Sequence, residues 1–118
     1  MHALAEVAYS KLHIPLAITG AQDFIKDKDH LFIISNGHPI LTKVTGAGCL
    51  LSSVCAAFLA ISDDVALALT DAISYYGVAA EVAASKQQHP GSFQMAFLDQ
   101  LYAIDGSVVQ AKQRIIRS

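Results

Sequence analysis

The spacing of hydrophobic residues changes twice within the first forty positions. Residues 2–12 carry apolar side chains three to four positions apart, which predicts an amphipathic helix. The continuous apolar run IPLAITG at 14–20 ends in glycine and predicts a short buried strand, and its place after a helix favours a parallel one. Residues 22–43 then read as an antiparallel ribbon, with turns at 27–29 (DKD) and 36–37 (NG).

The next segment is predicted to form two helices joined by a short turn. Residues from about 49 to 61 place their large apolar side chains on one stripe. The second helix, from about 64 to 86, is apolar nearly all round, which is typical of a buried helix. Ser62 or Asp63 is the predicted cap of this second helix.

Two further helices are predicted near the end of the chain. HPGS breaks the long helix, and Ser92 can cap a helix over 93–103. A last short helix is expected at 107–116, and the three cations of the tail QAKQRIIRS are interpreted as a solvated helix end. The order of helix, strand, ribbon and helices indicates an α/β fold, with too few strands for a complete doubly wound sheet.

The composition suggests that this chain has a large contact surface. Hydrophobic residues make up 53% of the 118 positions and charged residues only 15%. Average soluble chains have about 45–50% apolar and about 25% charged residues. We therefore expect an extensive partner surface, either in an oligomer or against further sequence. The net charge of −2 gives no electrostatic indication of nucleic-acid binding.

The cysteines and apolar runs indicate a soluble, cytoplasmic protein. Cys49 and Cys55 are six positions apart, which on one helix places them about 240° apart and prevents a disulfide. Free thiols suggest a reducing compartment. The N-terminal MHALAEVAYS does not have the pattern of a signal peptide, and the longest apolar run, VCAAFLAI, is too short to span a membrane.

The stretch KVTGAGC at 43–49 brings two glycines and a thiol to the start of a helix. Gly46 and Gly48 let the backbone approach an anion closely, and the amides of a helix N-terminus attract negative charge. In the first turn, Cys49 lies in a field that favours its thiolate. The stretch lacks the Lys-Ser or Lys-Thr of a P-loop, and Leu51 excludes a dinucleotide fingerprint. A plain tight turn is the alternative. Cys55 is interpreted as a core residue.

Other polar residues give weaker indications of a site. The histidines show no metal-binding spacing, so no metal site is predicted, and His38 is interpreted as structural. Asp23, Asp27 and Asp29 are interpreted as solvated charges of the ribbon rather than a catalytic pair. Thr19 ends the predicted buried strand, at the kind of strand end where α/β proteins bind ligands, and capping of that strand is the alternative.

Four stretches of the sequence carry a family pattern: LAITG at 16–20, NGHPILTKVTGAGCLLSSVCAAFLA at 36–60, SYYGVAAEVAA at 74–84 and PGSFQMAFLDQLY at 90–102. Together they resemble the hydroxyethylthiazole kinases, which are members of the ribokinase-like superfamily. The resemblance covers nearly the whole chain and keeps the family's order and spacing. It implies the C-terminal part of a ribokinase-like three-layer α/β fold, with a parallel strand and an antiparallel ribbon followed by several helices.

The resemblance also implies a reaction and its residues. The family transfers phosphate from ATP, with Mg²⁺, to the hydroxyl of 4-methyl-5-(2-hydroxyethyl)thiazole. Cys49 stands where many ribokinase-like enzymes carry a catalytic aspartate. Gly46 matches a glycine that contacts the substrate, and Thr19 matches a threonine that contacts ATP. The backbone from Gly46 through Ala47 and Gly48 to Cys49 would form the anion hole.

Family members are about twice as long as this chain and assemble as trimers. Residues 1–118 are therefore expected to form the C-terminal, nucleotide- and phosphate-binding half of one larger kinase domain, in a homo-oligomer. The other half would hold most of the thiazole pocket, an arginine for the ATP phosphates and acidic residues near magnesium. One alternative is a kinase of the hydroxymethylpyrimidine or pyridoxal type, against which Cys49 argues. Another is an inert folded fragment that acts only as an assembly module.

Overall fold

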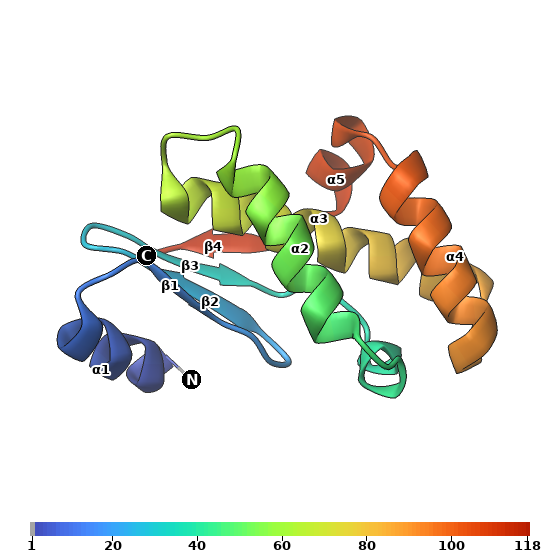
Figure 1. The fold of residues 1–118 in the computed structure, drawn as a ribbon, viewed down its shortest axis with the longest axis horizontal. Helices are drawn as coiled ribbons and strands as arrows, with labels where there is room; N and C mark the ends of the chain where they lie inside the picture. The colour runs from blue at the N-terminus through green and yellow to red at the C-terminus, as the bar shows by residue number, and fades with distance from the viewer. Residues whose placement is uncertain (1) are drawn as a thin grey trace.

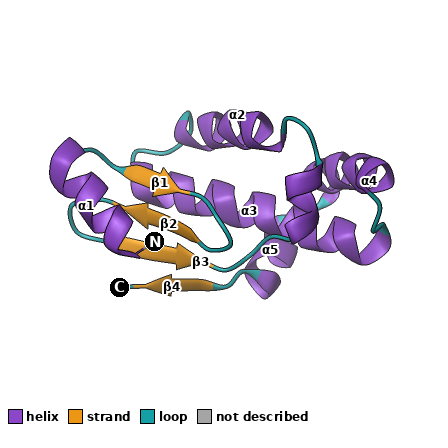
Figure 2. Ribbon diagram, turned by 90° about the horizontal axis from the view of Figure 1, so that it is seen from below, coloured by secondary structure: helices purple, strands orange, loops and turns teal. Residues whose placement is uncertain are grey.

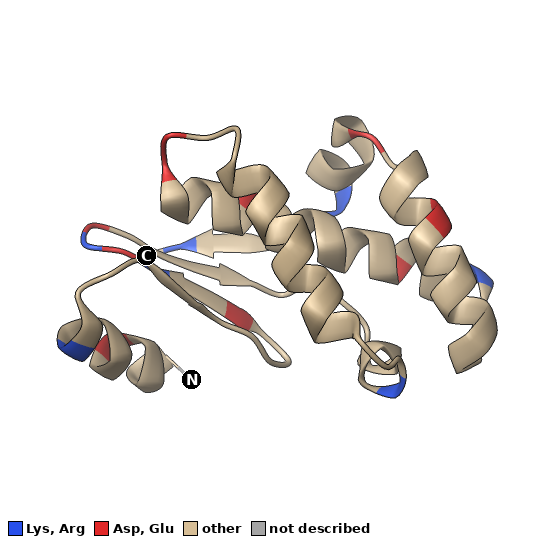
Figure 3. Ribbon diagram, in the orientation of Figure 1, with Lys and Arg blue, Asp and Glu red and all other residues tan. Residues whose placement is uncertain are grey.

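The computed structural model describes residues 2–118, which form one sheet with helices on both of its faces (Figure 1). The elements are α1 (His2–Leu12), β1 (Leu16–Ile18), β2 (Asp23–Lys26), β3 (Leu31–Ile34), the 3₁₀ helix η1 (Pro39–Lys43), α2 (Ala47–Leu59), α3 (Val65–Lys86), α4 (Pro90–Ala103), α5 (Gly106–Lys112) and β4 (Ile115–Arg117). The predicted α/β class is confirmed. Figure 3 shows residues of both charges scattered over a chain that is mostly uncharged.

The four strands lie in the order β1-β2-β3-β4, and every neighbouring pair is antiparallel. The prediction that residues 14–20 form a parallel strand is wrong for the pairing seen among residues 2–118. Only four residues, 19–22, connect β1 to β2. A connection this short joins antiparallel strands, because a parallel pair needs a crossover of about a dozen residues or more.

The strand side chains alternate between two apolar clusters on opposite faces of the sheet. Phe24 and Leu31 belong to the cluster that includes Ala5 of α1. Ile25 belongs to the opposite cluster, which includes Ile73 of α3. Figure 2 shows α1 and α3 on opposite sides of the strands. The sheet, whose side chains alternate between its two faces, is therefore the middle layer of three.

Helix α3 is the core helix of the structure, as its apolar sequence predicted. α2 and α4 each pack against it, and the stacked rings of Phe93 and Phe97 fill the space beneath α4, with centroids 5.5 Å apart. By length and composition α3 could also cross a membrane, but most of its apolar stretch is buried within the protein. Burial against α2, α4 and the sheet accounts for its apolar surface.

The pair Asn36-Gly37 does not form the predicted hairpin turn. Gly37 has a φ of 116°, which directs the chain away from the sheet and into η1. Pro39 begins η1, and the Nδ1 atom of His38 caps it by accepting the Ile40 amide at 3.1 Å. The structural role predicted for His38 at the exit of the ribbon is confirmed. Asn36 is buried, so its side chain serves the interior rather than a turn.

Three helix starts differ from their predicted positions. α2 begins at Ala47, two residues before the predicted start. α3 is capped by Asp64, which accepts the Leu67 amide at 3.1 Å, and not by Ser62 or Asp63. α4 begins at Pro90, so the predicted cap Ser92 lies inside the helix. Proline suits the first position of a helix, where its missing N–H has no partner to lose.

The predicted helix over 107–116 is also wrong in its second half. α5 stops at Lys112, and the last residues pair with β3 as strand β4. The predicted solvated helix end is therefore replaced by an edge strand, with Arg114 paired to Glu81 and Arg117 lying over the ring of Phe32. The free edge of β3 decides this outcome, and nothing local to residues 113–118 reveals that edge.

Candidate active site

A cavity of about 560 Å³ opens where four parts of the chain meet. These are the β1–β2 loop with the start of β2, the segment from the end of β3 into η1, the first turns of α2, and the middle of α3. The cavity therefore lies beside the KVTGAGC stretch. Ala47 and Gly48, from that stretch, line it together with Thr19.

The first turn of α2 presents backbone amides without a side-chain cap. Gly46 takes the N-cap position with a φ of 84°, a left-handed conformation that favours glycine. Since glycine has no side chain to accept from the following amides, the first turn of α2 keeps donors for a ligand. Amides at a helix N-terminus together with the helix dipole can bind an anion such as phosphate.

Tyr76 fixes the first turn of α2 against α3. Its hydroxyl donates a hydrogen bond of 2.5 Å to the carbonyl oxygen of Ala47. Its ring meets Phe97 edge-on, with centroids 4.8 Å apart, and its side chain lines the cavity. Burial raises the pKa of Tyr76 to about 12, so the phenol remains a donor at neutral pH. This tether holds the amides of the turn in a fixed position.

The loop that carries Thr19 is closed by Asp23. The amide of Gly20 donates to Asp23 Oδ1 at 3.1 Å, and both residues line the cavity with Thr19. Asp23 is only 9% exposed, so the prediction that it is a solvated charge is wrong. Burial raises the pKa of its carboxyl, and the Gly20 hydrogen bond partly opposes that rise. Asp27, by contrast, caps the β2–β3 turn by accepting the amides of Asp29 and His30.

The predicted site residues are brought together only in part. Thr19, Ala47 and Gly48 line one cavity, although 28 positions separate Thr19 from Ala47 in the sequence. Gly46 and Cys49 are exposed and flank the lining pair. Cys49 lies in the first turn of α2, as predicted, with its thiol open to solvent. The roles assigned to these residues stay predictions.

Cys55 packs inward, as predicted for a core residue. It is partly buried against the cluster that contains Ile25 and Phe32. Burial raises the pKa of its thiol, which makes it a weaker nucleophile at neutral pH. Cys49, with its exposed thiol, is therefore the better candidate for chemistry on α2.

Among residues 2–118, no three His, Cys, Asp or Glu side chains come together in a way that could hold a metal ion. Asp23 is the one carboxylate among the described residues that line the cavity. A divalent cation bound here would therefore need most of its ligands from water or from a bound phosphate.

A sequence model described as "HK: Hydroxyethylthiazole kinase family" matches residues 1–107. The chain belongs to the hydroxyethylthiazole kinase family. The family resemblance that rested on the TGAGC stretch and its surroundings is thereby confirmed.

Two hydroxyethylthiazole kinases illustrate how much of the family fold this chain spans. A curated hydroxyethylthiazole kinase from Moorella thermoacetica is 50% identical over 95 residues, which is 80% of this chain and 36% of the relative. A solved hydroxyethylthiazole kinase structure from Pyrococcus horikoshii OT3 matches with a TM-score of 0.92 and 33% identity. It covers 98% of this chain, whereas this chain covers 45% of it. The chain thus spans less than half the length of these relatives.

The cavity contains polar residues that sequence reasoning missed. Asp23, Asn36 and Tyr76 all line the cavity. The alternation of β2 contains an indication for Asp23, because it shares a face with Ile25, which is fully buried. Tyr76 gave no such indication, because its role depends on the distant Ala47 carbonyl.

Replacing Asp23 by asparagine is expected to stabilise the protein at neutral pH, because burial of the charged carboxylate is unfavourable. The amide oxygen can still accept the Gly20 amide, while the buried charge is lost. The pKa of the Asp23 carboxyl is higher in the folded chain than in the unfolded chain, so the folded chain holds this proton to a higher pH. The stability of the wild type therefore falls as the pH rises and this proton is lost. The advantage of the variant should therefore grow as the pH rises above about 4, the ordinary pKa of aspartate, as measured by urea unfolding.

Asp27→Asn is the matched control for this stability measurement. Burial acts to raise the pKa of Asp27. Hydrogen bonds from the His30 and Asp29 amides and from the His30 side chain outweigh this effect and lower the pKa below its usual value. The charged form is therefore favoured by folding, and Asp27→Asn should be less stable than wild type at neutral pH. A loss of stability at neutral pH in Asp23→Asn would contradict the prediction.

Proposed function

We propose that this chain forms the nucleotide- and phosphate-binding half of a hydroxyethylthiazole kinase. The reaction is transfer of the γ-phosphoryl group of ATP to the hydroxyl of 4-methyl-5-(2-hydroxyethyl)thiazole, in thiamin biosynthesis or salvage. The observation that carries this proposal is the cavity shared by the Thr19 loop and the uncapped first turn of α2. We propose that a complete thiazole pocket also needs the part of the family fold that these 118 residues do not span.

The first turn of α2 would act as the anion hole. In phosphoryl transfer the oxygen of the acceptor alcohol bonds to the γ-phosphorus while the bond to the β–γ bridging oxygen breaks, and ADP leaves. Charge on the γ-phosphoryl oxygens would be met by the amides of Gly48 and Cys49, whereas the amide of Ala47 already donates to the Val44 carbonyl oxygen at 3.4 Å. Amides that are already oriented need no reorganisation as the charge develops. The Tyr76 hydrogen bond to Ala47 would keep them oriented.

Cys49 would receive the proton of the acceptor alcohol. Its thiol is exposed next to Gly48, where a thiazole alcohol held at the mouth of the cavity could reach it. A loose transition state releases the alcohol proton late, so orientation of the hydroxyl is a large part of this role. The thiolate accepts the proton and returns it to solvent after ADP has left.

ATP would bind with its phosphates at the first turn of α2 and would contact Thr19, and Gly46 would contact the thiazole substrate. We propose that Mg²⁺ enters on the nucleotide phosphates and water, since among residues 2–118 there is no cluster of ligands for it. Bound in this way, the cation would neutralise phosphate charge. We also propose a cytoplasmic location, where ATP is available.

Cys49→Ala is expected to lower kcat by roughly 10²-fold, the low end of general-base contributions. KM for ATP should change little, because the thiol faces the acceptor rather than the nucleotide. A coupled assay of ATP consumption with the thiazole alcohol measures both constants. Cys55→Ala is the control, since it removes the other thiol of the same helix from a core position. Unchanged kcat in the Cys49 variant would exclude the catalytic role.

An assembly role is a second candidate, favoured by the apolar side chains left on the surface. The most exposed of these on helices and strands are Leu4, Val7, Leu12, Ile116, Met95 and Tyr102. We propose that part of this surface is covered in a homo-oligomer, a trimer by analogy with the family. Wild type that shows no ATP turnover at high concentration, yet sediments as an oligomer, would favour an inert assembly module over the kinase.

A further inference from the structure

Asp23 is a buried carboxylate of which only one oxygen accepts a hydrogen bond. Its side chain lines the cavity and is nine-tenths buried. Oδ1 accepts the Gly20 amide, whereas Oδ2 accepts no hydrogen bond within residues 2–118. The ion pairs seen in this part of the chain involve Glu6, Asp27 and Glu81 instead. Among the described residues the one buried side-chain atom without a partner is Ser74 Oγ, so Asp23 Oδ2 is open to the cavity, where a ligand can donate to it.

Closing the loop does not require the negative charge at this position. Asparagine or serine could accept the Gly20 amide equally well and would avoid the cost of burying an ion. The parts of α3 that line the cavity are Ile73, Tyr76 and Gly77, none of which carries a positive charge. The negative charge of Asp23 therefore faces the cavity and is not needed to hold the loop closed.

Asp23 and the first turn of α2 give the cavity two chemically opposite ends. The amides and dipole of α2 attract an anion at Ala47 and Gly48. The Asp23 carboxylate repels an anion and attracts hydroxyl or amino donors. A ligand that matches both ends carries phosphate on one side and hydrogen-bond donors on the other.

We propose that Asp23 makes the cavity selective for nucleoside polyphosphates over inorganic polyphosphate, by accepting a hydrogen bond from a hydroxyl or amino group of the nucleoside. The proposal rests on the nucleotide-binding function proposed above and adds a residue that determines specificity. Hydrogen bonds to a charged acceptor are stronger than neutral ones. Losing one leaves the ligand with an unpaired donor, and removing the charge relieves repulsion of phosphate.

The test compares ATP with inorganic tripolyphosphate as ligands of wild type and Asp23→Asn, by calorimetry with EDTA present. Asparagine keeps the size of the side chain and the acceptor for Gly20. For ATP we expect affinity in the variant to fall by about tenfold. For tripolyphosphate we expect affinity to rise by a few-fold. Asp29→Asn, which removes the same charge from an exposed position in the β2–β3 turn, should change neither.

Opposite shifts for the two ligands would establish the proposal, because loss of a merely structural contact weakens both. Equal weakening of both ligands would overturn it and leave Asp23 as a loop-closing residue. An effect that appears only when Mg²⁺ replaces EDTA would also overturn it, since Asp23 would then act on the cation. Binding of ATP with unchanged affinity in the variant would overturn this inference alone. Failure of wild type to bind ATP would instead overturn the proposed nucleotide function, and this inference with it.

Discussion

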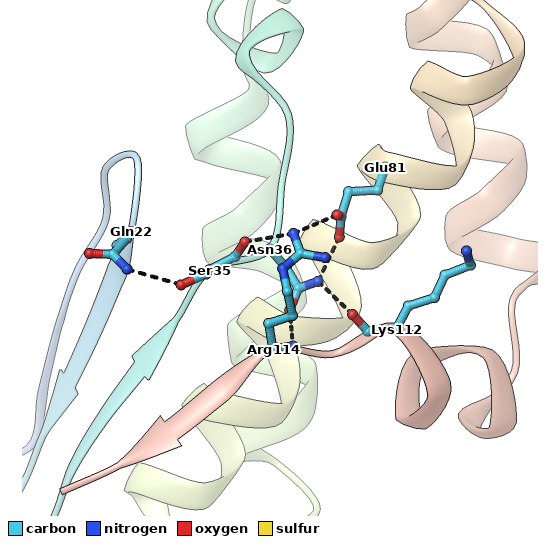
Figure 4. A network of polar contacts seen from close by, with 6 residues as sticks. All are labelled: Gln22, Ser35, Asn36, Glu81, Lys112 and Arg114. Carbon is cyan, nitrogen blue, oxygen red and sulfur yellow. Dashed lines mark hydrogen bonds and ion pairs between the residues drawn. The ribbon is translucent and has the colours of Figure 1, made fainter.

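Asn36→Ala is expected to lower the free energy of unfolding by about 2–3 kcal/mol, the upper part of the usual range for a single substitution that breaks a hydrogen-bond network. Asn36 is 6% exposed, and its amide nitrogen donates to Glu81 Oε2 at 2.6 Å and to the Lys112 carbonyl at 3.0 Å. Its amide oxygen accepts the Arg114 backbone amide at 2.7 Å. Figure 4 shows this side chain between β3, α3 and the start of β4. Alanine would remove all three of these part-buried hydrogen bonds.

Asn36→Asp separates lost hydrogen bonds from lost volume. The aspartate has the same shape and still accepts the Arg114 amide, but it cannot donate, and it places a second negative charge beside Glu81. It should therefore be at least as destabilising as alanine at neutral pH. Gln22→Ala is the control, since Gln22 makes one exposed hydrogen bond to Ser35 at the edge of the same network. Urea midpoints of all three variants measure the effect, and an Asn36→Asp midpoint close to that of wild type would refute it.

Gly77→Ala is expected to cost about 2–3 kcal/mol, the usual range for overpacking. A Cβ at this position would lie 2.8 Å from the Cβ of Asn36, 3.0 Å from its carbonyl carbon and 3.1 Å from the Gly37 amide nitrogen. Two of these three atoms belong to the backbone, so a side-chain rotation cannot relieve the contact. α3 would have to move away from the end of β3, where both segments line the cavity.

The sign of the effect distinguishes this contact from helix propensity. Alanine favours an exposed helix interior over glycine by about 1 kcal/mol. Gly91 lies within α4 and has nothing within 4 Å of an added Cβ, so Gly91→Ala should be neutral or stabilising. Thermal unfolding of the two variants side by side checks the prediction. Equal midpoints for Gly77→Ala and Gly91→Ala would show that α3 does not depend on this close approach.

The predicted stability effects and the proposed site are connected through the same residues. Asn36 and Gly77 line the cavity, and both join α3 to the segment that leaves β3. Tyr76, next to Gly77, holds the first turn of α2. α3 therefore aligns two walls of the cavity, and the same packing that stabilises the fold sets the position of the proposed anion hole.

Local patterns in the sequence were sufficient for several elements and for the family. The period of residues 2–12 defined α1, and the apolar surface around 64–86 identified α3 as a core helix. The Gly-rich turn that leads into α2 followed from the TGAGC stretch, because close backbone approach is a local requirement that glycine meets, whereas the start of the helix at Ala47 did not follow from it. The same stretch with its flanking residues carried the resemblance that the family match confirmed.

The tertiary structure decided what depends on distant partners. Residues 115–117 became a strand because β3 offers a free edge, and β1 runs antiparallel because its connection to β2 is short. Asn36 serves a buried network instead of a turn because Glu81 and Arg114 reach it from 45 and 78 positions away. Asp23 became part of the cavity because α3 covers its face of the sheet. Sequence periodicity reports which side chains need burial, but only the folded chain determines which polar groups are buried with them.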